Sequence, residues 1–368
     1  MLNEKRWKDV SELEQQWNEV TSGSSLFAGW SWASSWWAMW AESCDLKLQL
    51  YSFSADDGTL VAIVPLFTNQ RKSRLGFTVN QLQVFGNIYP TGTTVLSEYS
   101  DILVRQGYEE DVSAALIRLL SNIQWDEFII PYTTAGSFLF KRLQEHSNYF
   151  RFVDTKQEGP GVIVNAAVGF DGYLASLGKN TRLKLYNRRQ LLQSLGPVKI
   201  EYANAAGIGE YLSELNGLDR SRWGRDCFGP QSLAFHVEIA GHASQRGELK
   251  LSRITVNCEV VSVLYNICFN GVEYNIQSAF KQDYHPKISL GTLHLGYAIE
   301  RAFNDDKIES FDLLYGEGKN TFYKQRLGGD EIQFYTILCG KTYRALLVFR
   351  TKVIFRRIKS VFRRFFPF

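Results

Sequence analysis

The chain has 368 residues, 45% of them hydrophobic and 21% charged, which are ordinary values for a globular protein. At about 150 residues per domain, this length predicts two domains. The net charge of +3 conceals an asymmetry, because residues 341–368 hold nine Lys or Arg and no Asp or Glu, and the rest of the chain is mildly acidic. An acidic body disfavours a nucleic-acid-binding protein.

The five cysteines are scattered without a C-x-x-C pair, which argues against a disulfide framework and against a zinc site. A reducing compartment fits this usage best. The first residues, 1–17, are charged, and no run reaches the roughly 18 apolar residues of a membrane-spanning helix. We therefore expect a cytoplasmic protein.

The first half of the chain predicts an alternation of helices and strands. Helices are expected at 9–20 and 30–42, and the tryptophans of the second helix, at the spacing 32/36/40, suit one helix face. Such a row forms core more often than a ligand wall. Two strand-like runs around Asp57-Gly58 predict a hairpin. The later elements of this half are a strand at 101–104, a helix near 109–121, a strand at 127–132 and a helix at 136–146.

A polar segment around Lys156–Gly161 predicts the domain boundary. The order of elements then repeats, which predicts a second unit built like the first. Its expected elements are a helix at 173–196, a strand at 198–203, helices at about 207–222 and 231–246, strands at 248–257, 259–269 and 272–280, a helix at 289–305 and a strand at 310–316.

The segment from Val272 to Lys324 carries the clearest chemical pattern: a strand, a loop, a helix that opens near Leu290, and a second strand. A helix N-terminus presents about four unpaired N–H groups and a partial positive charge, which suit a phosphate. Gly291 lets a bulky anion approach the backbone, and Ser289 can cap the helix or donate its hydroxyl. A strand splayed from its neighbour would leave N–H groups for a pantetheine chain or a thioester oxygen. The alternative is an ordinary helix N-cap.

Six short motifs together resemble one protein family. They are L-N-G-L-D-R-S-R-W-G at 215–224, A-F-H at 234–236, G-x-L-x-L at 247–251, Q-S-A-F-x-x-x-Y at 277–284, S-L-G-T-L at 289–293 and F-D-L-L-Y-G-E-x-x-x-x-x-Y-K at 311–324. The segment 171–330 resembles the BioF2-like acetyltransferases of the CelD/BcsL type, which are associated with cellulose biosynthesis. That family is related to the Fem-type peptidoglycan aminoacyltransferases, which pair two N-acetyltransferase-like (GNAT) units.

The resemblance implies an α/β fold with a mixed sheet, made of two tandem GNAT-like units and a basic amphipathic C-terminal helix. The expected division is a degenerate N-terminal unit at 1–158, an acetyltransferase unit at 159–340 and a tail at 341–368. The resemblance also implies that acetyl-CoA, or another acyl-CoA, is the co-substrate and that no metal is needed. The pyrophosphate-binding turn would be formed by Lys287, Ile288, Ser289, Leu290, Gly291 and Thr292, where Leu290 departs from the proline that the family often has before the glycine.

Acyl transfer to an amine needs a deprotonated amine, a polarised thioester and a route for protons. Glu317 is the predicted general base or amine-positioning carboxylate, and Tyr323 is the predicted proton donor to the leaving thiolate. Asp312 is a further catalytic candidate, with a structural contact to Arg222 as its alternative. Lys324 would orient Glu317 or bind phosphate. For Glu317 and Tyr323 the alternative is a satisfied surface pair.

Three further residues are candidate substrate ligands: Arg222 and Trp223 at the end of a predicted helix, and Tyr284 just before the phosphate turn. A packed tryptophan covered by the arginine is the alternative for the first two. No metal site is predicted, because no pair of histidines has a carboxylate at a zinc-like spacing. The sequence also lacks a P-loop and a G-x-S-x-G motif.

The tail at 341–368 is predicted to form an interfacial amphipathic helix. Its apolar side would carry Leu347, Ile354, Phe355, Ile358, Val361, Phe362 and Phe365, and its basic side Arg350, Arg356, Arg357, Lys359, Arg363 and Arg364. Loose association with anionic lipid on the inner face of the cell membrane is one expectation. Docking of this helix on its own domain is the other.

Together these observations predict an acyl-CoA-dependent N-acyltransferase that is cytoplasmic and peripheral to the membrane. The acceptor is expected to be an amine such as an amino sugar, in exopolysaccharide or envelope synthesis, a substrate class implied by the resemblance alone. One alternative is a Fem-like transferase that uses aminoacyl-tRNA, which the acidic body disfavours. Another is a non-catalytic GNAT-fold scaffold at a membrane polysaccharide synthase.

Overall fold

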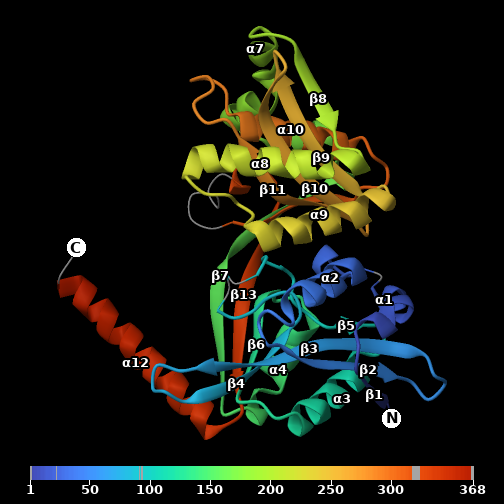
Figure 1. The fold of residues 1–368 in the computed structure, drawn as a ribbon, viewed down its shortest axis with the longest axis vertical. Helices are drawn as coiled ribbons and strands as arrows, with labels where there is room; N and C mark the ends of the chain where they lie inside the picture. The colour runs from blue at the N-terminus through green and yellow to red at the C-terminus, as the bar shows by residue number, and fades with distance from the viewer. Residues whose placement is uncertain (1, 22, 91, 93, 317–323, 366–368) are drawn as a thin grey trace. The chain divides into compact units, whose positions relative to one another are not determined.

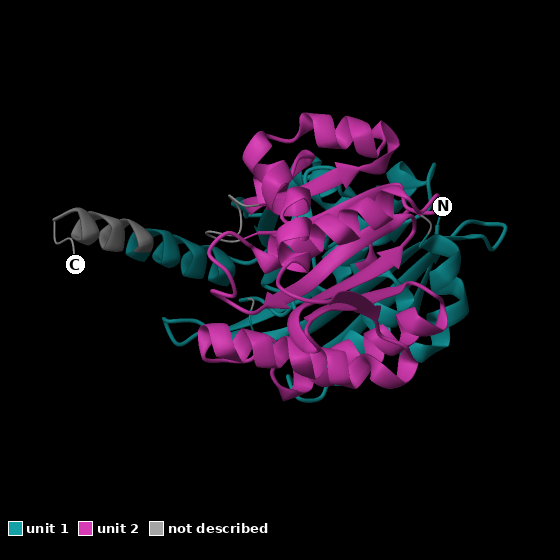
Figure 2. Ribbon diagram, turned by 90° about the horizontal axis from the view of Figure 1, so that it is seen from above, with its two compact units in different colours: residues 1–22, 27–158, 335–368 teal, residues 23–26, 159–334 magenta. Residues whose placement is uncertain are grey.

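The computed structural model describes residues 2–21, 23–90, 92, 94–316 and 324–365, with side chains described as far as Phe355. The chain forms two compact units: unit 1 comprises residues 1–22, 27–158 and 335–368, and unit 2 comprises residues 23–26 and 159–334 (Figure 2). The chain returns to unit 1 at Tyr335, before residue 340, where the sequence places the end of the second unit. The last strand, β13 (Asp330–Gly340), contributes residues to both units.

Unit 1 is built on a mixed sheet in the strand order β1-β2-β3-β4-β6, with β5 paired to β3 (Figure 1). Its strands are β1 (Asn3–Trp7), β2 (Lys47–Ser54), β3 (Leu60–Lys72), β4 (Thr78–Val84), β5 (Leu103–Val104) and β6 (Glu127–Thr134). Its helices are α1 (Glu14–Val20), α2 (Trp30–Trp40), α3 (Glu109–Asn122), α4 (Phe138–Glu145) and α12 (Tyr343–Phe365). Neighbouring strands are antiparallel except β4 and β6, which run parallel.

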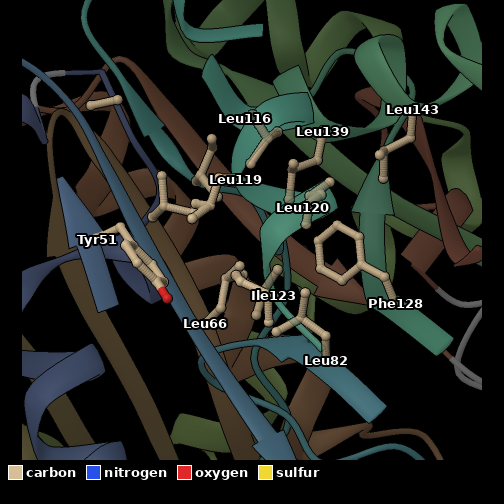
Figure 3. Close-up of a cluster of buried hydrophobic side chains, with 14 of the residues drawn as sticks. Tyr51, Leu66, Leu82, Leu116, Leu119, Leu120, Ile123, Phe128, Leu139 and Leu143 are labelled. Carbon is tan, nitrogen blue, oxygen red and sulfur yellow. The ribbon is translucent and has the colours of Figure 1, made fainter. Parts of the chain in front are cut away.

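Helix α3 joins β4 to β6 and buries one face in the core of unit 1. Val112, Leu116 and Leu119 recur at three- and four-residue spacing, and each is at most 1% exposed. They belong to one cluster with Leu82 of β4 and Phe128 of β6 (Figure 3). Burial of each such side chain stabilises the fold by about 1.5–3 kcal/mol, so the helical periodicity of apolar residues accounts for this helix.

The tryptophans of α2 also face the core. Trp32, Trp36 and Trp40 are each at most 2% exposed. The ring centroid of Trp36 lies 5.5 Å from that of Phe67 and 5.9 Å from that of Phe85, in tilted arrangements. These contacts support the core alternative for the tryptophan row, because large rings buried this fully stabilise mainly by packing.

Unit 2 has a mixed sheet in the order β12-β11-β10-β9-β8, and the end of β7 (Phe152–Asn165) pairs with β12. Its other strands are β8 (Val198–Tyr202), β9 (Leu249–Val256), β10 (Glu259–Phe269), β11 (Val272–Phe280) and β12 (Ser310–Tyr315). Its helices are α5 (Phe170–Ser176), α6 (Lys179–Arg182), α7 (Arg189–Gln193), α8 (Ile208–Trp223), α9 (Pro230–Gln245) and α10 (Leu290–Phe303). The strands β11 and β12 run parallel.

The single helix expected at 173–196 is wrong, because the structure divides this stretch into α5, α6, a π-helical turn η5 (Leu183–Asn187) and α7. The extended backbone of Gly178 separates the first two helices. The π-helical turn lies against α10 at Gly296, where a Cβ atom would stand 2.3 Å from the carbonyl oxygen of Leu185. Close packing against another helix therefore accompanies the irregular turn.

Both units contain the same strand–helix–strand arrangement. In unit 1, α3 bridges a parallel ladder that pairs Gln81–Gln83 with Glu127–Ile129. In unit 2, α10 bridges a parallel ladder that pairs Val272–Tyr274 with Ser310–Asp312. The repeat of element order that the sequence predicted is therefore present in the structure, with three residue pairs in each ladder.

Candidate functional site

The strands β11 and β12 separate soon after they begin. Their ladder ends at Tyr274 and Asp312, although β11 continues to Phe280. On its other side, β11 stays paired with β10 from Val272 to Phe280, with a β-bulge at Ile276 where the register shifts. Because backbone N–H groups alternate between the two sides of a strand, some N–H groups of 275–280 point away from β10. This geometry matches the splayed strand that the sequence led us to expect.

A left-handed residue in β12 marks the place where the strand leaves regular pairing. Leu314 has a φ of 59°, and its N–H donates to Asp312 Oδ1 at 2.7 Å. The ammonium of Lys324 donates to the carbonyl oxygen of Leu313, to that of Leu314 at 3.1 Å and to that of Tyr315 at 2.7 Å. Asp312 and Lys324 thus hold one backbone turn at the end of β12.

These contacts refine what the sequence suggested for two candidate residues. Asp312 is 1% exposed, and its carboxylate is bonded to the backbone of its own strand. Burial raises the pKa of the neighbouring Tyr274, and the charge of Asp312 raises it further. Lys324 contacts backbone carbonyls, whereas the sequence suggested Glu317 or a phosphate as its target. Glu317 and Tyr323, the predicted base and proton donor, lie outside the described residues.

The N-terminus of α10 lies beyond the end of β11 along the chain. Its N-cap residue, Ser289, does not cap a backbone N–H, because its Oγ bonds to Oγ1 of Thr292 at 2.9 Å. Of the two roles considered for Ser289, capping the helix is therefore wrong, and donation of its hydroxyl to a ligand stays a prediction. The first turn contains no acidic residue, and the nearby Lys287 side chain is exposed. The backbone N–H groups of this turn thus keep the partial positive charge of a helix N-terminus.

Gly291 serves packing at this turn. A Cβ atom at this position would stand 2.4 Å from the ring of Phe280, the last residue of β11. The ring of Phe280 therefore fills the space that the missing side chain of Gly291 leaves. The prediction that this space admits an anion to the backbone is wrong. The absent side chain allows the end of β11 and the start of α10 to lie in close contact.

Other residues of the predicted turn anchor it in the core of unit 2. Ile288 is 9% exposed and Leu290 is 1% exposed, and both pack in a cluster with Leu293. The half-buried Tyr284 packs against the same cluster. Their side chains face the protein interior and fix the start of α10 against the sheet.

Arg222, at the end of α8, lies beside the same turn. Its guanidinium carbon is 4.4 Å from the ring centroid of Phe280 and 4.6 Å from that of Trp223. Its buried Nε has no hydrogen-bond partner among the described residues. Trp223 is 63% exposed, so the packed-tryptophan alternative does not hold for it. The cation and the helix N-terminus therefore both adjoin Phe280, and the exposed ring of Trp223 lies beside the cation.

Two buried histidines have structural surroundings. His294 of α10 lies between Ser252 and Ser262, with its Nε2 3.0 Å from one hydroxyl and its Nδ1 2.9 Å from the other. Burial lowers the pKa of His294 to about 3, as it does for His236. Both rings are neutral at physiological pH. In the part of the chain that the structure describes, no three His, Cys, Asp or Glu side chains are placed to hold a metal ion.

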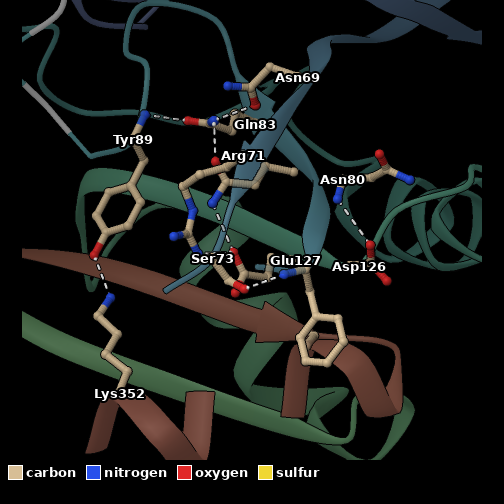
Figure 4. A network of polar contacts seen from close by, with 12 residues as sticks. Asn69, Arg71, Ser73, Asn80, Gln83, Tyr89, Asp126, Glu127 and Lys352 are labelled. Atoms are coloured by element: carbon tan, nitrogen blue, oxygen red, sulfur yellow. Dashed lines mark hydrogen bonds and ion pairs between the residues drawn. The ribbon is translucent and has the colours of Figure 1, made fainter. Parts of the chain in front are cut away.

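The corresponding place in unit 1 has the opposite charge. The first turn of α3 carries Glu109, Glu110 and Asp111. At the parallel ladder, the buried carboxylate of Glu127 is approached by the guanidinium of Arg71 at 3.4 Å (Figure 4). Acidic side chains at a helix N-terminus satisfy its partial positive charge and repel a phosphate. Of these two helix starts, the one in unit 2 is therefore better suited to an anionic ligand.

Sequence reasoning missed Phe280 and the backbone target of Lys324. Phe280 entered only as a letter of the Q-S-A-F motif, although it touches both Gly291 and Arg222. No local pattern predicts these contacts, because Lys324 and its carbonyl partners, like Phe280 and its two neighbours, are at least nine residues apart in the chain. A composition signal did exist for the contrast between units, because the three acidic residues of α3 are visible in the sequence.

Residues 179–325, which lie in unit 2, match the family model of an acetyltransferase (GNAT) domain. The solved structure of FemX is similar over 90% of this chain and 96% of that chain, with a TM-score of 0.58 and 10% identity. A conserved protein of unknown function from Bacteroides thetaiotaomicron is similar over 93% and 100%, with a TM-score of 0.55 and 11% identity. The sequence has no significant match among proteins of curated function.

A third similar structure is the C-terminal domain of a putative lysylphosphatidylglycerol synthetase from Agrobacterium fabrum. It has a TM-score of 0.54 and 10% identity, and the similarity covers 94% of this chain and 97% of that one. At such identities the structural matches establish the fold alone. They confirm the predicted mixed α/β fold, and the domain match confirms the predicted class of enzyme, an acyltransferase of the GNAT type.

Proposed function

We propose that this GNAT-type acyltransferase transfers an acyl group, most simply acetyl, from acyl-CoA to an amine at the splayed strands of unit 2. The main observation that supports this proposal is that the β11–β12 ladder ends early, next to the N-terminus of α10, whose first turn has no acidic residue. Arg222 supports the proposal, because it adds a cation beside that helix start. Phosphate binding at a helix N-terminus is strengthened by a nearby guanidinium.

In this proposal the backbone of 275–280 binds the pantetheine chain and polarises the thioester carbonyl. The start of α10 and Arg222 hold the pyrophosphate. The neutral amine attacks the carbonyl carbon, a C–N bond forms, the C–S bond breaks and the thiolate leaves as CoA after protonation. Glu317 is proposed to accept the amine proton, and Tyr323 to protonate the thiolate. Asp312 and Lys324 position these groups through the backbone turn that they hold.

The acceptor is proposed to be an amino sugar or a related amine in exopolysaccharide or envelope synthesis, in the cytoplasm at the inner face of the membrane. This part of the proposal rests on the motif resemblance to the BioF2-like, CelD/BcsL-type acetyltransferases. Trp223, which is exposed and lies beside Arg222, is proposed to contact the acceptor.

Calorimetric titration of the full chain with acetyl-CoA and with CoA tests the donor. Arg222→Ala is expected to weaken binding by roughly tenfold or more, the usual effect of losing a charge-assisted contact. Arg220→Ala is the matched control, because Arg220 lies on the same helix, is exposed and pairs with Asp226. It should leave affinity unchanged. Arg222→Ala is preferable to a large residue at position 291, which would collide with Phe280.

Glu317→Gln separates binding from catalysis. It should retain acetyl-CoA binding and lose turnover with a panel of amino-sugar acceptors. Failure of the unmodified protein to bind either CoA compound would reject the acyl-CoA donor and direct attention to aminoacyl-tRNA. If the Glu317→Gln variant bound acetyl-CoA and kept its turnover, a residue other than Glu317 would be the general base. Binding without any turnover would leave a scaffold that retains the fold.

A further inference from the structure

The C-terminal helix α12 docks on unit 1 through one face. Ala345 is fully buried and Val348 is 8% exposed. The ring of Phe349 stacks on that of Phe152 with centroids 4.3 Å apart. Lys352 Nζ lies 3.2 Å from the hydroxyl of Tyr89 (Figure 4). Residues 345, 348, 349 and 352 are three or four apart, so they share one side of the helix.

A different side of α12 is apolar and exposed. Leu347 is 50% exposed, Ile354 is 56% exposed and Phe355 is 49% exposed. Leu347 and Ile354 are seven residues apart, which places them on one line along the helix and away from the docked side, whereas Phe355, seven residues after Val348, lies beside that line. In the sequence, Val361 continues this spacing, and Ile358, Phe362 and Phe365 lie within four residues of it. The helix thus docks on its own unit, but through a face other than the apolar side that the sequence analysis considered.

Charge identifies what covers this exposed side. The segment 341–368 has nine basic residues and no acidic one, and the described Arg350 is exposed beside Leu347. A second copy of the helix would bring like charges together, because Arg350, Arg357 and Arg364 recur every seven residues and no acidic residue in the segment can pair with them. An anionic lipid surface would accept both the apolar side chains and the arginines.

We propose that α12 holds the protein on an anionic membrane surface, with the side that carries Leu347 and Ile354 inserted at the level of the lipid headgroups. The helix lies along the surface, and among the described residues no helix is long and apolar enough to cross a membrane. The docked face keeps unit 1 attached to the helix while the opposite side binds lipid. This inference does not depend on the acyl donor.

Co-sedimentation of the full chain with vesicles tests the proposal. We expect binding to phosphatidylcholine vesicles that contain phosphatidylglycerol, weaker binding to phosphatidylcholine alone, and a decline with added salt. The double variant Leu347→Gln/Ile354→Gln should reduce the vesicle partition coefficient by roughly tenfold or more, because two inserted apolar side chains are lost. Deleting the whole helix is less informative, because it would also expose the surface around Phe152 on which Phe349 packs.

The matched control is Leu75→Gln/Phe77→Gln, which removes two apolar side chains of unit 1 that are 43% and 42% exposed. It should leave vesicle binding unchanged. Unaltered melting temperatures would show that both double variants are folded. Equal binding of the helix variant and the unmodified protein would overturn the proposal. So would a dimer, measured by light scattering, that the helix variant converts to a monomer, because a second copy would then cover this side.

Discussion

Gly291 and Arg222 show how one aromatic ring connects residues from three elements of unit 2. Phe280 ends β11, fills the space beside Gly291 at the start of α10 and lies under the guanidinium of Arg222 at the end of α8. The ring therefore determines how closely the splayed strand approaches the helix start. Neither the glycine nor the arginine has this role by itself.

The role of Gly291 in packing leads to a stability prediction. Gly291→Ala would place a Cβ 2.4 Å from Phe280, so the ring must shift, and we expect a loss of about 1–3 kcal/mol in the free energy of unfolding. Gly241→Ala in α9 is the control, because no atom lies within 4 Å of its Cβ position. That substitution should stabilise by about 0.5–1 kcal/mol. Chemical denaturation measures the free energy of unfolding of both variants and of the unmodified protein. A Gly291→Ala variant as stable as the unmodified protein would contradict the packing role of Gly291.

At the scale of elements, the turn at the end of β12 depends on Lys324. Its ammonium gathers three consecutive carbonyls around a residue in the left-handed region. Such a backbone conformation is uncommon for leucine and persists only where the surroundings hold it. The turn helps to end the ladder with β11, which is the feature on which the proposed donor site rests.

Lys324→Met should loosen this turn, because methionine keeps the apolar stem and removes the three N–H donors. We expect faster hydrogen exchange of the backbone amides in 311–315, with exchange in β10 unchanged. Lys307→Met, at an exposed position, should leave both strands unaffected. Unaltered exchange in β12 of the Lys324 variant would show that the ammonium does not hold the turn.

At the scale of the whole molecule, one architecture occurs twice with different chemistry. Each unit bridges a three-pair parallel ladder with a helix. The helix start of unit 1 carries three acidic residues, whereas that of unit 2 carries none. The duplication therefore supplies two similar arrangements, and of these two helix starts the second offers a phosphate the more favourable field.

This contrast predicts the stoichiometry of donor binding. We expect one molecule of CoA per chain in calorimetric titration, bound in unit 2. A second binding event that survives Arg222→Ala would contradict the prediction and assign a working donor site to unit 1. Replacing the acidic residues of α3 by glutamine provides a further check, since it should not alter the affinity of the site in unit 2.

The sequence did not predict strands β1, β7 and β13, and the polar segment near Gly159 lies within β7. By itself it determined most of the other helices and strands, the repeat of their order and the amphipathic tail. These features follow from periodicity, glycine and charge within short segments, which act locally. It also pointed to the strand–turn–helix segment that holds the candidate site. Its predicted base and proton donor, Glu317 and Tyr323, stay predictions because they lie outside the described residues.

Only the tertiary structure decided what several of these residues contact. The π-helical turn at 183–187 lies against Gly296, and the ring of Phe280 fills the space beside Gly291. Helix α12 docks through Ala345 and Val348, and Leu347 stays exposed. Each of these contacts depends on which part of the chain, separate in the sequence, packs against the residue in the folded protein. Periodicity shows that a helix has an apolar side, but the neighbouring elements determine which side is covered.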